Sequence, residues 1–293
     1  MFTPFLRLAE LQAAGIIPLN ELAEVEKLLY GNVPEGSILE RVTKVENTVY
    51  NKKQSGSIVE RTERIVSDVL KSTENKPSLL FLFNTVEWSI TGELGPGNLV
   101  ERLNNLEMRV VGEQNEGPIK DRIEALYRIS ISGTDMPINK VKSEKNQLIR
   151  VELLEKITSK SASRGEKISY KITEDIKVDN TLIIPKGSVG ELEVTEIEEA
   201  GKMGRDGDIK IGFPKLKTID GTPIKVAIRE EAQEENESQK LAIGASILGT
   251  ALLGLPGVIA GYFVEGKDEE IPAGSNMYIQ ITENKELLGI LVE

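Results

Sequence analysis

The sequence predicts an α+β protein whose first half contains short repeated helices and whose second half is an antiparallel β barrel or sandwich. A motif of about twenty residues recurs in the first half, strand-like segments alternate with turns in the second, and 24 uncharged residues, Leu241–Val264, interrupt the strands. We therefore expect a helical repeat domain over 1–127, a linker over 128–146 and a β domain over 147–293. An apolar helical hairpin over 241–265 is expected as an insertion in the β domain.

Each helical repeat begins with a capping signal and ends with a residue suited to left-handed backbone. A Ser or Asn is followed three positions later by Glu, in the pairs Ser37/Glu40, Ser57/Glu60 and Asn98/Glu101. Apolar residues then recur at helical spacing, and Gly31, Asn51 and Gly112 follow the last turn. Helices of about twelve residues are too short to be stable alone, so each must bury its apolar stripe against neighbours.

An arginine recurs at the same place in four repeats, at Arg41, Arg61, Arg102 and Arg122. Two interpretations stay open. These arginines are candidate contacts to an anionic partner, or they pair with the glutamates that accompany them. Likewise, the repeats are either an extended docking scaffold or a small bundle that supports the β domain.

The second half shows runs of β-branched and apolar residues separated by turn signals. The expected strands are 149–157, 167–172, 181–184, 189–197, 208–216, 224–229, 276–281 and 287–292. Two phrases have the same pattern, Ile184-Pro185-Lys186-Gly187-Ser188 and Ile271-Pro272-Ala273-Gly274-Ser275. Proline in second and glycine in fourth position predict a type I turn before each following strand, so an internally duplicated barrel is one possibility and a common turn the other.

Composition excludes several classes of function. The chain has no histidine and no cysteine, so imidazole bases, thiol nucleophiles, His or Cys metal sites and disulfides are absent. The net charge of −11 argues against a nucleic-acid partner. No spacing typical of a phosphate loop or an EF-hand is present, so we expect no enzyme activity, no cofactor and no metal site.

The uncharged run contains a glycine zipper, with small residues spaced so that helices can pack closely. The candidate membrane or oligomer contacts are Gly244, Gly249, Gly254, Pro256, Gly257 and Gly261. Three interpretations remain: one transmembrane helix, a helical hairpin that turns at Leu255-Pro256-Gly257, or a buried core or oligomer helix. The hairpin is favoured because strands of one expected domain lie on both sides of the run, which a single crossing would separate. Glutamates dominate the flanks, and 230–240 is expected to be a solvated linker.

Residues 150–293 resemble a β domain of bacterial envelope proteins related to conjugation-type (TrbI-like) secretion subunits. The phrases that carry the resemblance are Thr158-Ser159-Lys160, Gly165-Glu166-Lys167, 182–188, 200–204, 220–224 and the apolar insertion with 271–275. The resemblance implies β domains that assemble as a ring, with an inserted helical element that reaches the outer membrane. The inner-membrane helix and Pro-rich spacer of those subunits are lacking here. The repeats resemble segments of exported proteins from diderm relatives of Gram-positive bacteria.

The sequence thus predicts a non-enzymatic structural component of the bacterial envelope. We expect a homo-oligomer that contacts an envelope protein, a membrane or a cell-wall polymer. It would lie in the periplasm or at the outer membrane, with Met1 replacing a removed signal peptide, because the segment 1–15 is not itself a secretory signal. The alternative is a soluble binding module that recognises a protein or cell-wall polymer through its helical repeats, with the apolar run as core.

Overall fold

The structure is a computed structural model that describes residues 16–130, 136–200, 206–238, 268 and 270–292. The described residues form two units. The helical unit comprises those up to Val86 and those from Gly97 to Ser130, and the β unit comprises Glu87–Pro96 and everything after the helices. None of the helices in these ranges is long and apolar enough to cross a membrane.

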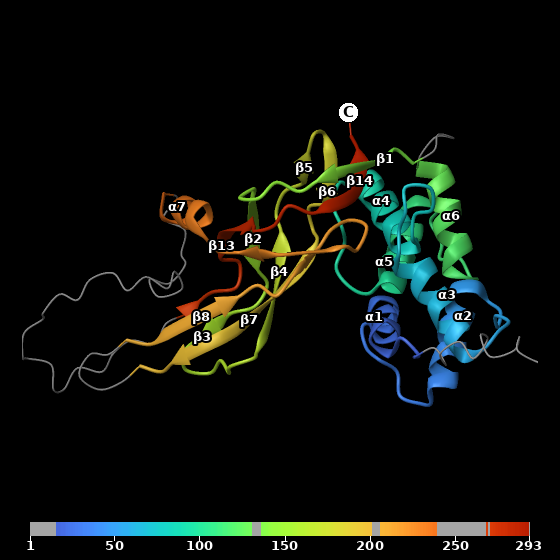
Figure 1. Cartoon of the computed structure of the whole chain (residues 1–293), viewed down its shortest axis with the longest axis horizontal. Coiled ribbons are helices and arrows are strands. Elements are labelled where there is room, and N and C mark those ends of the chain that lie inside the picture. The colour runs from blue at the N-terminus through green and yellow to red at the C-terminus, as the bar shows by residue number, and fades with distance from the viewer. Residues whose placement is uncertain (1–15, 131–135, 201–205, 239–267, 269, 293) are drawn as a thin grey trace, which may run out of the picture. The chain divides into compact units, whose positions relative to one another are not determined.

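Six short helices make up the predicted repeats (Figure 1). They are α1 (Leu19–Tyr30), α2 (Ile38–Tyr50), α3 (Ile58–Leu70), α4 (Leu79–Thr91), α5 (Leu99–Val110) and α6 (Ile119–Ser130). The three predicted capping boxes are confirmed at Ser37, Ser57 and Asn98. Gly31 and Asn51 adopt the left-handed conformation that ends α1 and α2, as predicted.

Helices α1, α2 and α3 run in the same direction. Along α2, Glu46 and then Tyr50 bond to Arg61 and then Asp68 along α3, so both helices advance together. The same holds for α1 and α2, where Glu26 bonds to Arg41 and Tyr30 to Thr48. Each connector must therefore return along the length of a helix, which an extended segment of about seven residues can span.

The array winds back on itself. Helix α1 packs against both α3 and α5, and α2 packs against α3 and α6. Contacts between helices four apart along the chain show that the unit is a closed bundle and not an extended linear array. Its core is built from the predicted stripes, with Val42, Ile65 and Leu103 fully buried.

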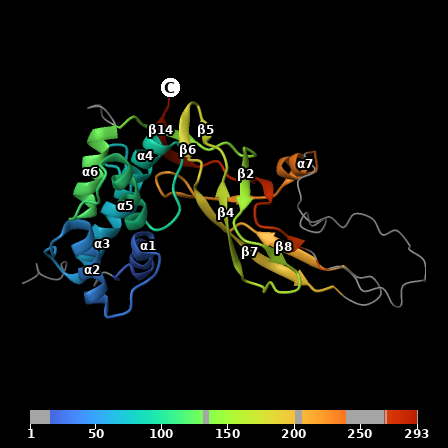
Figure 2. The same cartoon turned by 180° about the vertical axis from the view of Figure 1, so that it is seen from behind.

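The β unit contains fourteen described strands, all of whose pairings are antiparallel (Figure 2). They are β1 (Ile138–Lys142), β2 (Leu148–Leu153), β3 (Ile157–Thr158), β4 (Lys167–Ile172), β5 (Ile176–Val178), β6 (Thr181–Ile184), β7 (Val189–Glu198), β8 (Asp208–Gly212), β9 (Leu216–Lys217), β10 (Pro223–Ile224), β11 (Val226–Ala227), β12 (Glu270–Ile271), β13 (Asn276–Ile281) and β14 (Glu286–Leu291). The largest sheet has the order β11-β13-β2-β4-β7-β8, and a second has the order β1-β14-β6-β5. The predicted α+β class is confirmed.

One apolar cluster joins these sheets. Alternate residues of the strands point into it, as in β2, where Ile149, Val151 and Leu153 are buried. Tyr170 belongs to this cluster, with no exposed surface and a ring 5.6 Å from that of Phe213. Gly190 is required beside it, because a Cβ there would lie 2.4 Å from the Tyr170 hydroxyl.

The two matching phrases fold alike. In each, the serine N–H donates to the proline carbonyl across 3.2 Å, and Gly187 and Gly274 both have φ of +82°. The glycine is therefore the third residue of a type II turn that starts at proline, and the predicted type I turn is wrong. Each turn also forms two backbone hydrogen bonds with the last residue of a strand. The first turn bonds to Ile172 of β4, and the second bonds to Leu153 of β2. This shared pattern favours internal duplication.

Two segments expected to be linkers are ordered elements. Residues 138–142, inside the predicted linker 128–146, form β1, which pairs with the last strand, β14. Residues 230–238 form the helix α7 (Glu230–Ser238), although a solvated linker was expected over 230–240. Both segments are rich in polar residues, and their order depends on partners far away in the sequence.

Candidate functional site

The predicted membrane or oligomer contacts lie outside the described residues. Gly244, Gly249, Gly254, Pro256, Gly257 and Gly261 all fall in 239–267. The structure does describe how the chain enters and leaves this segment. Helix α7 precedes it, and strand β12 follows it.

Asn236 attaches α7 to strand β13. Its side-chain NH2 donates to the Tyr278 carbonyl at 3.0 Å, and its side-chain oxygen accepts from the Tyr278 N–H at 2.6 Å. Strand β11 pairs with β13 at Gln280 and Ile281, and this pairing stops before it reaches Tyr278. The amide of Asn236 thus takes the place of a strand residue, and it is buried there.

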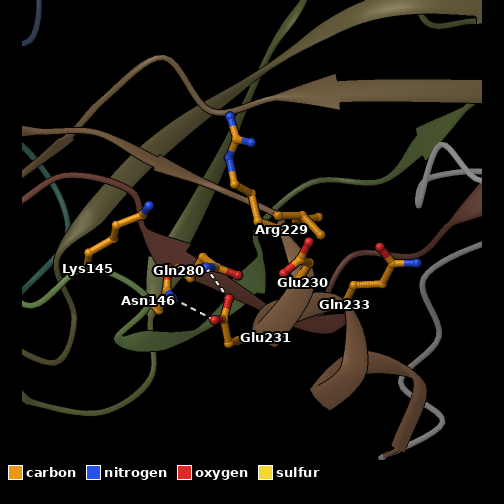
Figure 3. Close-up of a pocket in the computed structure, with 8 residues that line it drawn as sticks. Lys145, Asn146, Arg229, Glu230, Glu231, Gln233 and Gln280 are labelled. Atoms are coloured by element: carbon orange, nitrogen blue, oxygen red, sulfur yellow. Dashed lines mark hydrogen bonds between the residues drawn. The ribbon is translucent and has the colours of Figure 1, made fainter.

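A second group of hydrogen bonds fixes the first turn of α7 (Figure 3). Gln280, which is buried, accepts from the Ala232 N–H and donates to Glu231 at 2.6 Å. Glu231 also accepts from the side chain of Asn146 at 2.6 Å. Asn146, Glu231, Asn236, Tyr278 and Gln280 together are called the α7 anchor below.

A polar cavity of about 410 Å³ adjoins the anchor. It is lined by Lys145, Asn146, Ile228, Arg229, Glu230, Glu231, Gln233 and Gln280 (Figure 3). Its charged groups are of both signs, and the side chain of Gln280, which is buried, already has protein partners. No group of three His, Cys, Asp or Glu in the described ranges is arranged to hold a metal ion. The arrangement is suited to holding α7 in place.

The returning chain is fixed to the same unit. Strand β12 pairs with β3, where Ile271 lies opposite Ile157 and both side chains are buried. Just before it, Asp268 accepts a hydrogen bond from Ser159 at 3.5 Å. Both ends of the apolar segment are therefore held by one folded β unit.

The four repeated arginines face neighbouring helices. Arg61 makes a bidentate ion pair with Glu46, in which Nε donates to Oε1 at 2.9 Å and Nη2 donates to Oε2 at 2.6 Å. The Arg61 side chain is 4% exposed and the Glu46 side chain 0%. The same pair, fifteen residues apart, joins Arg41 to Glu26 and Arg122 to Glu107. Arg102 donates to Asn84, eighteen residues earlier. These partners lie in the preceding helix; a role of the arginines in binding a partner stays a prediction.

The electrostatics of the repeats reflect these contacts. Hydrogen bonds from the Ser57 backbone and hydroxyl lower the pKa of Glu60, and Ser37 does the same for Glu40. Burial opposes ionisation of Glu107, but hydrogen bonds from Arg122 and Asn115 outweigh it and lower its pKa. The sequence signalled the capping glutamates. The buried glutamates also recur, fifteen residues before each repeated arginine, at Glu26, Glu46, Glu87 and Glu107, and this constant spacing is the signal that could have identified them.

Comparisons with known proteins establish no family. No family model matches the chain, and no curated protein matches it. Among solved structures, the chain is similar to ComB10 of the Com type IV secretion system of Helicobacter pylori, with 16% identity over 52% of this chain and 97% of that one. The TM-score is 0.28, too low for an argument about this chain.

Proposed function

We propose that this protein is a non-enzymatic structural component of the bacterial cell envelope. In this proposal the glycine-rich segment 241–265 mediates oligomerisation or contact with the outer membrane, and the helical unit is a docking scaffold. The proposal rests on the resemblance of residues 150–293 to envelope secretion subunits and on the position of the segment in the β unit.

The observation that carries the proposal is that the segment starts and ends on one folded unit. Asn236 and Gln280 fix the start, and the pairing of Ile271 with Ile157 fixes the end. A chain that leaves and re-enters one unit on the same side of a bilayer cannot cross it an odd number of times. This argues against the single transmembrane helix and favours a hairpin that dips into a membrane or packs with copies of itself.

The anchors give such a hairpin a rigid base. Helix α7 is too short to be stable alone, so its hydrogen bonds to β13 hold it in place. The acidic residues of α7 include Glu230, Glu234 and Glu237, all exposed. A negatively charged base of this kind favours neutral over anionic lipid surfaces.

The test is the light-scattering mass of the protein with and without residues 241–264, in buffer and in detergent. The proposal expects the intact chain to form a defined oligomer or to require detergent, and the variant with a short Gly-Ser replacement to be a folded monomer. A detergent-free intact monomer whose deletion variant unfolds would overturn it. The apolar run would then be core, and the alternative of a soluble binding module would stand.

A second variant separates the two roles of the segment. Replacing its five glycines with leucine keeps the run apolar but removes the close helix approach that small residues allow. If the segment packs with copies of itself, the variant loses the defined oligomer. If it acts by entering lipid, the variant still floats with phosphatidylcholine vesicles.

A further inference from the structure

The cavity beside the α7 anchor contains charged side chains that the anchor does not use. The carboxylate of Glu231 is engaged by Gln280. Lys145, Arg229 and Glu230 line the same cavity, and within the described part of the chain their side chains have neither a hydrogen-bond partner nor an ion-pair partner. Two cations and one anion therefore line the cavity without a counter-ion from the protein.

The opposite charges come from different parts of the fold. Lys145 lies in the loop between β1 and β2, and Glu230 is the first residue of α7. Figure 3 shows their side chains on either side of Gln280, with the guanidinium of Arg229 directed away from Glu230. Lys145 and Glu230 form no ion pair with each other. The cavity thus has one side suited to an anion and another suited to a cation.

The size and the charges of the cavity fit a small zwitterion. Its volume of about 410 Å³ falls within the range of about 300–1,000 Å³ that is usual for small-molecule sites. Lysine and arginine bind phosphate or carboxylate groups, and a carboxylate accepts hydrogen bonds from an ammonium group. A simple anion would be repelled by Glu230, and a simple cation by Lys145 and Arg229. A ligand that carries both charges pairs with both sides.

The lining also indicates the kind of ammonium group. Quaternary ammonium groups such as choline are recognised by the faces of aromatic rings. Among the described residues that line the cavity none is aromatic, and Ile228 alone is apolar. A primary ammonium group donates three hydrogen bonds, which suits the carboxylate of Glu230. The cavity therefore fits ethanolamine better than choline.

We propose that this cavity binds a phosphoethanolamine group, in which a phosphate diester is joined to a primary ammonium. In this assignment Lys145 and Arg229 bind the phosphate, and Glu230 binds the ammonium. The same chemistry occurs in the head group of phosphatidylethanolamine and in free soluble compounds, and the experiment below distinguishes these two sources.

Helix α7 connects the cavity to the apolar segment. Glu230 and Glu231 line the cavity from its first turn, and its last residue, Ser238, precedes the chain that enters 241–265. At 1.5 Å per residue, the nine residues of α7 span only about 13 Å. Where the segment contacts a membrane, the cavity would select phosphatidylethanolamine beside it. This lipid role rests on the proposed function, whereas binding of the free head group does not.

The first test uses soluble probes with the full chain in a maltoside detergent, which contains no phosphate. The probes are glycerophosphoethanolamine, glycerophosphocholine and glycerophosphoglycerol, whose phosphate diesters carry the same charge. Phosphorus NMR line broadening measures their binding. Wild type should bind the ethanolamine probe about two- to fivefold more tightly than the other two, because that is the contribution of one exposed ion pair.

Substitutions separate the two sides of the cavity. Lys145→Gln with Arg229→Gln should weaken binding of all three probes by at least about fourfold. Glu230→Gln should abolish the preference for the ethanolamine probe without weakening the other two. Lys177→Gln and Glu234→Gln, at exposed residues outside the lining, are the matched controls. Hydrogen exchange checks that α7 stays docked in each variant.

The second test identifies the source of the ligand. Flotation of the protein with phosphatidylcholine vesicles is compared with flotation with vesicles that also contain phosphatidylethanolamine. Greater flotation with the mixed vesicles, lost in Glu230→Gln, identifies the lipid. Selective binding of the soluble probe without this lipid effect identifies a free compound. If no vesicle binds, the membrane role of the segment fails, but the soluble probes still test the cavity.

The proposal is overturned by three results with the soluble probes. The first is that wild type binds none of them, and the second is that it binds all three equally. The third is that binding is unchanged in the variant that lacks both Lys145 and Arg229.

Discussion

Removing the side chain of Asn236 should weaken the attachment of α7 to the β unit. In Asn236→Ala the N–H and C=O of Tyr278 lose their hydrogen bonds to the Asn236 side chain, which is buried while α7 is docked. A hydrogen bond of this kind contributes about 0.5–1.5 kcal/mol, so the loss of two costs roughly 1–3 kcal/mol.

Little else holds the helix. Of its nine residues, Ala232 and Asn236 are buried, and burying the Ala232 methyl contributes only about 0.8 kcal/mol. The remaining bonds, from Gln280 and Asn146, contribute about 0.5–1.5 kcal/mol each. The loss is thus a large share of the free energy that holds α7 to the β unit, and α7 should open locally more often, because an isolated helix of this length is unstable.

Hydrogen exchange followed by mass spectrometry measures this directly. A loss of about 2 kcal/mol corresponds to roughly thirtyfold faster exchange in 230–238. Gln233→Ala on the same helix is the control, because Gln233 bonds only to exposed Glu237 among the contacts described. Unchanged protection of α7 in Asn236→Ala, or equal loss in the control, would refute the reasoning.

Three further predictions concern stability. Arg61→Ala leaves Glu46 buried without its ion-pair partner and should lower the free energy of unfolding by about 3–5 kcal/mol in urea titrations. Glu63→Ala, at an exposed residue of the same helix, should change it by less than about 0.5 kcal/mol. The pKa of Glu60 is lowered in the folded protein, so its carboxylate stabilises the fold above the ordinary pKa of 4.5, and this stability is lost as the pH falls through the pKa of the folded state. Glu60→Gln should therefore flatten the acid limb of a plot of stability against pH. An unaltered acid limb would contradict this. Tyr170→Phe removes a buried hydroxyl that has no partner among the described residues, and should leave the melting temperature unchanged or raise it, whereas a clear decrease would indicate a contact that we have missed.

The sequence predicted best what depends on local chemistry. The capping boxes at Ser37 and Ser57 were predictable because Ser and Glu three residues apart satisfy each other's backbone donors. Strands 167–172, 181–184 and 276–281 were predicted to the residue, because alternating or continuous apolar runs there are bounded by turn residues.

What depends on distant partners was not predictable. Helix α7 has a polar composition, and it is ordered because Asn236 meets Tyr278, 42 residues later. The pairing of Arg61 with Glu46 follows from helix packing, since the nearer Glu60 is engaged by Ser57, and in the sequence only the recurrence of Glu fifteen residues before each repeated arginine indicates it. Closure of the repeats into a bundle likewise depends on contacts between α1 and α5 that no repeat signals by itself.

The central claim is that the chain enters and leaves segment 241–265 on the same side of any membrane it contacts. The protein has no cysteine, so single cysteines at exposed Ser238 and Glu270 report on the two flanks separately. Each variant is added to preformed phosphatidylcholine vesicles and treated with a membrane-impermeant maleimide, before and after the vesicles are lysed. The account predicts that both positions are labelled fully before lysis. Protection of one position until lysis would show a single crossing and contradict the account.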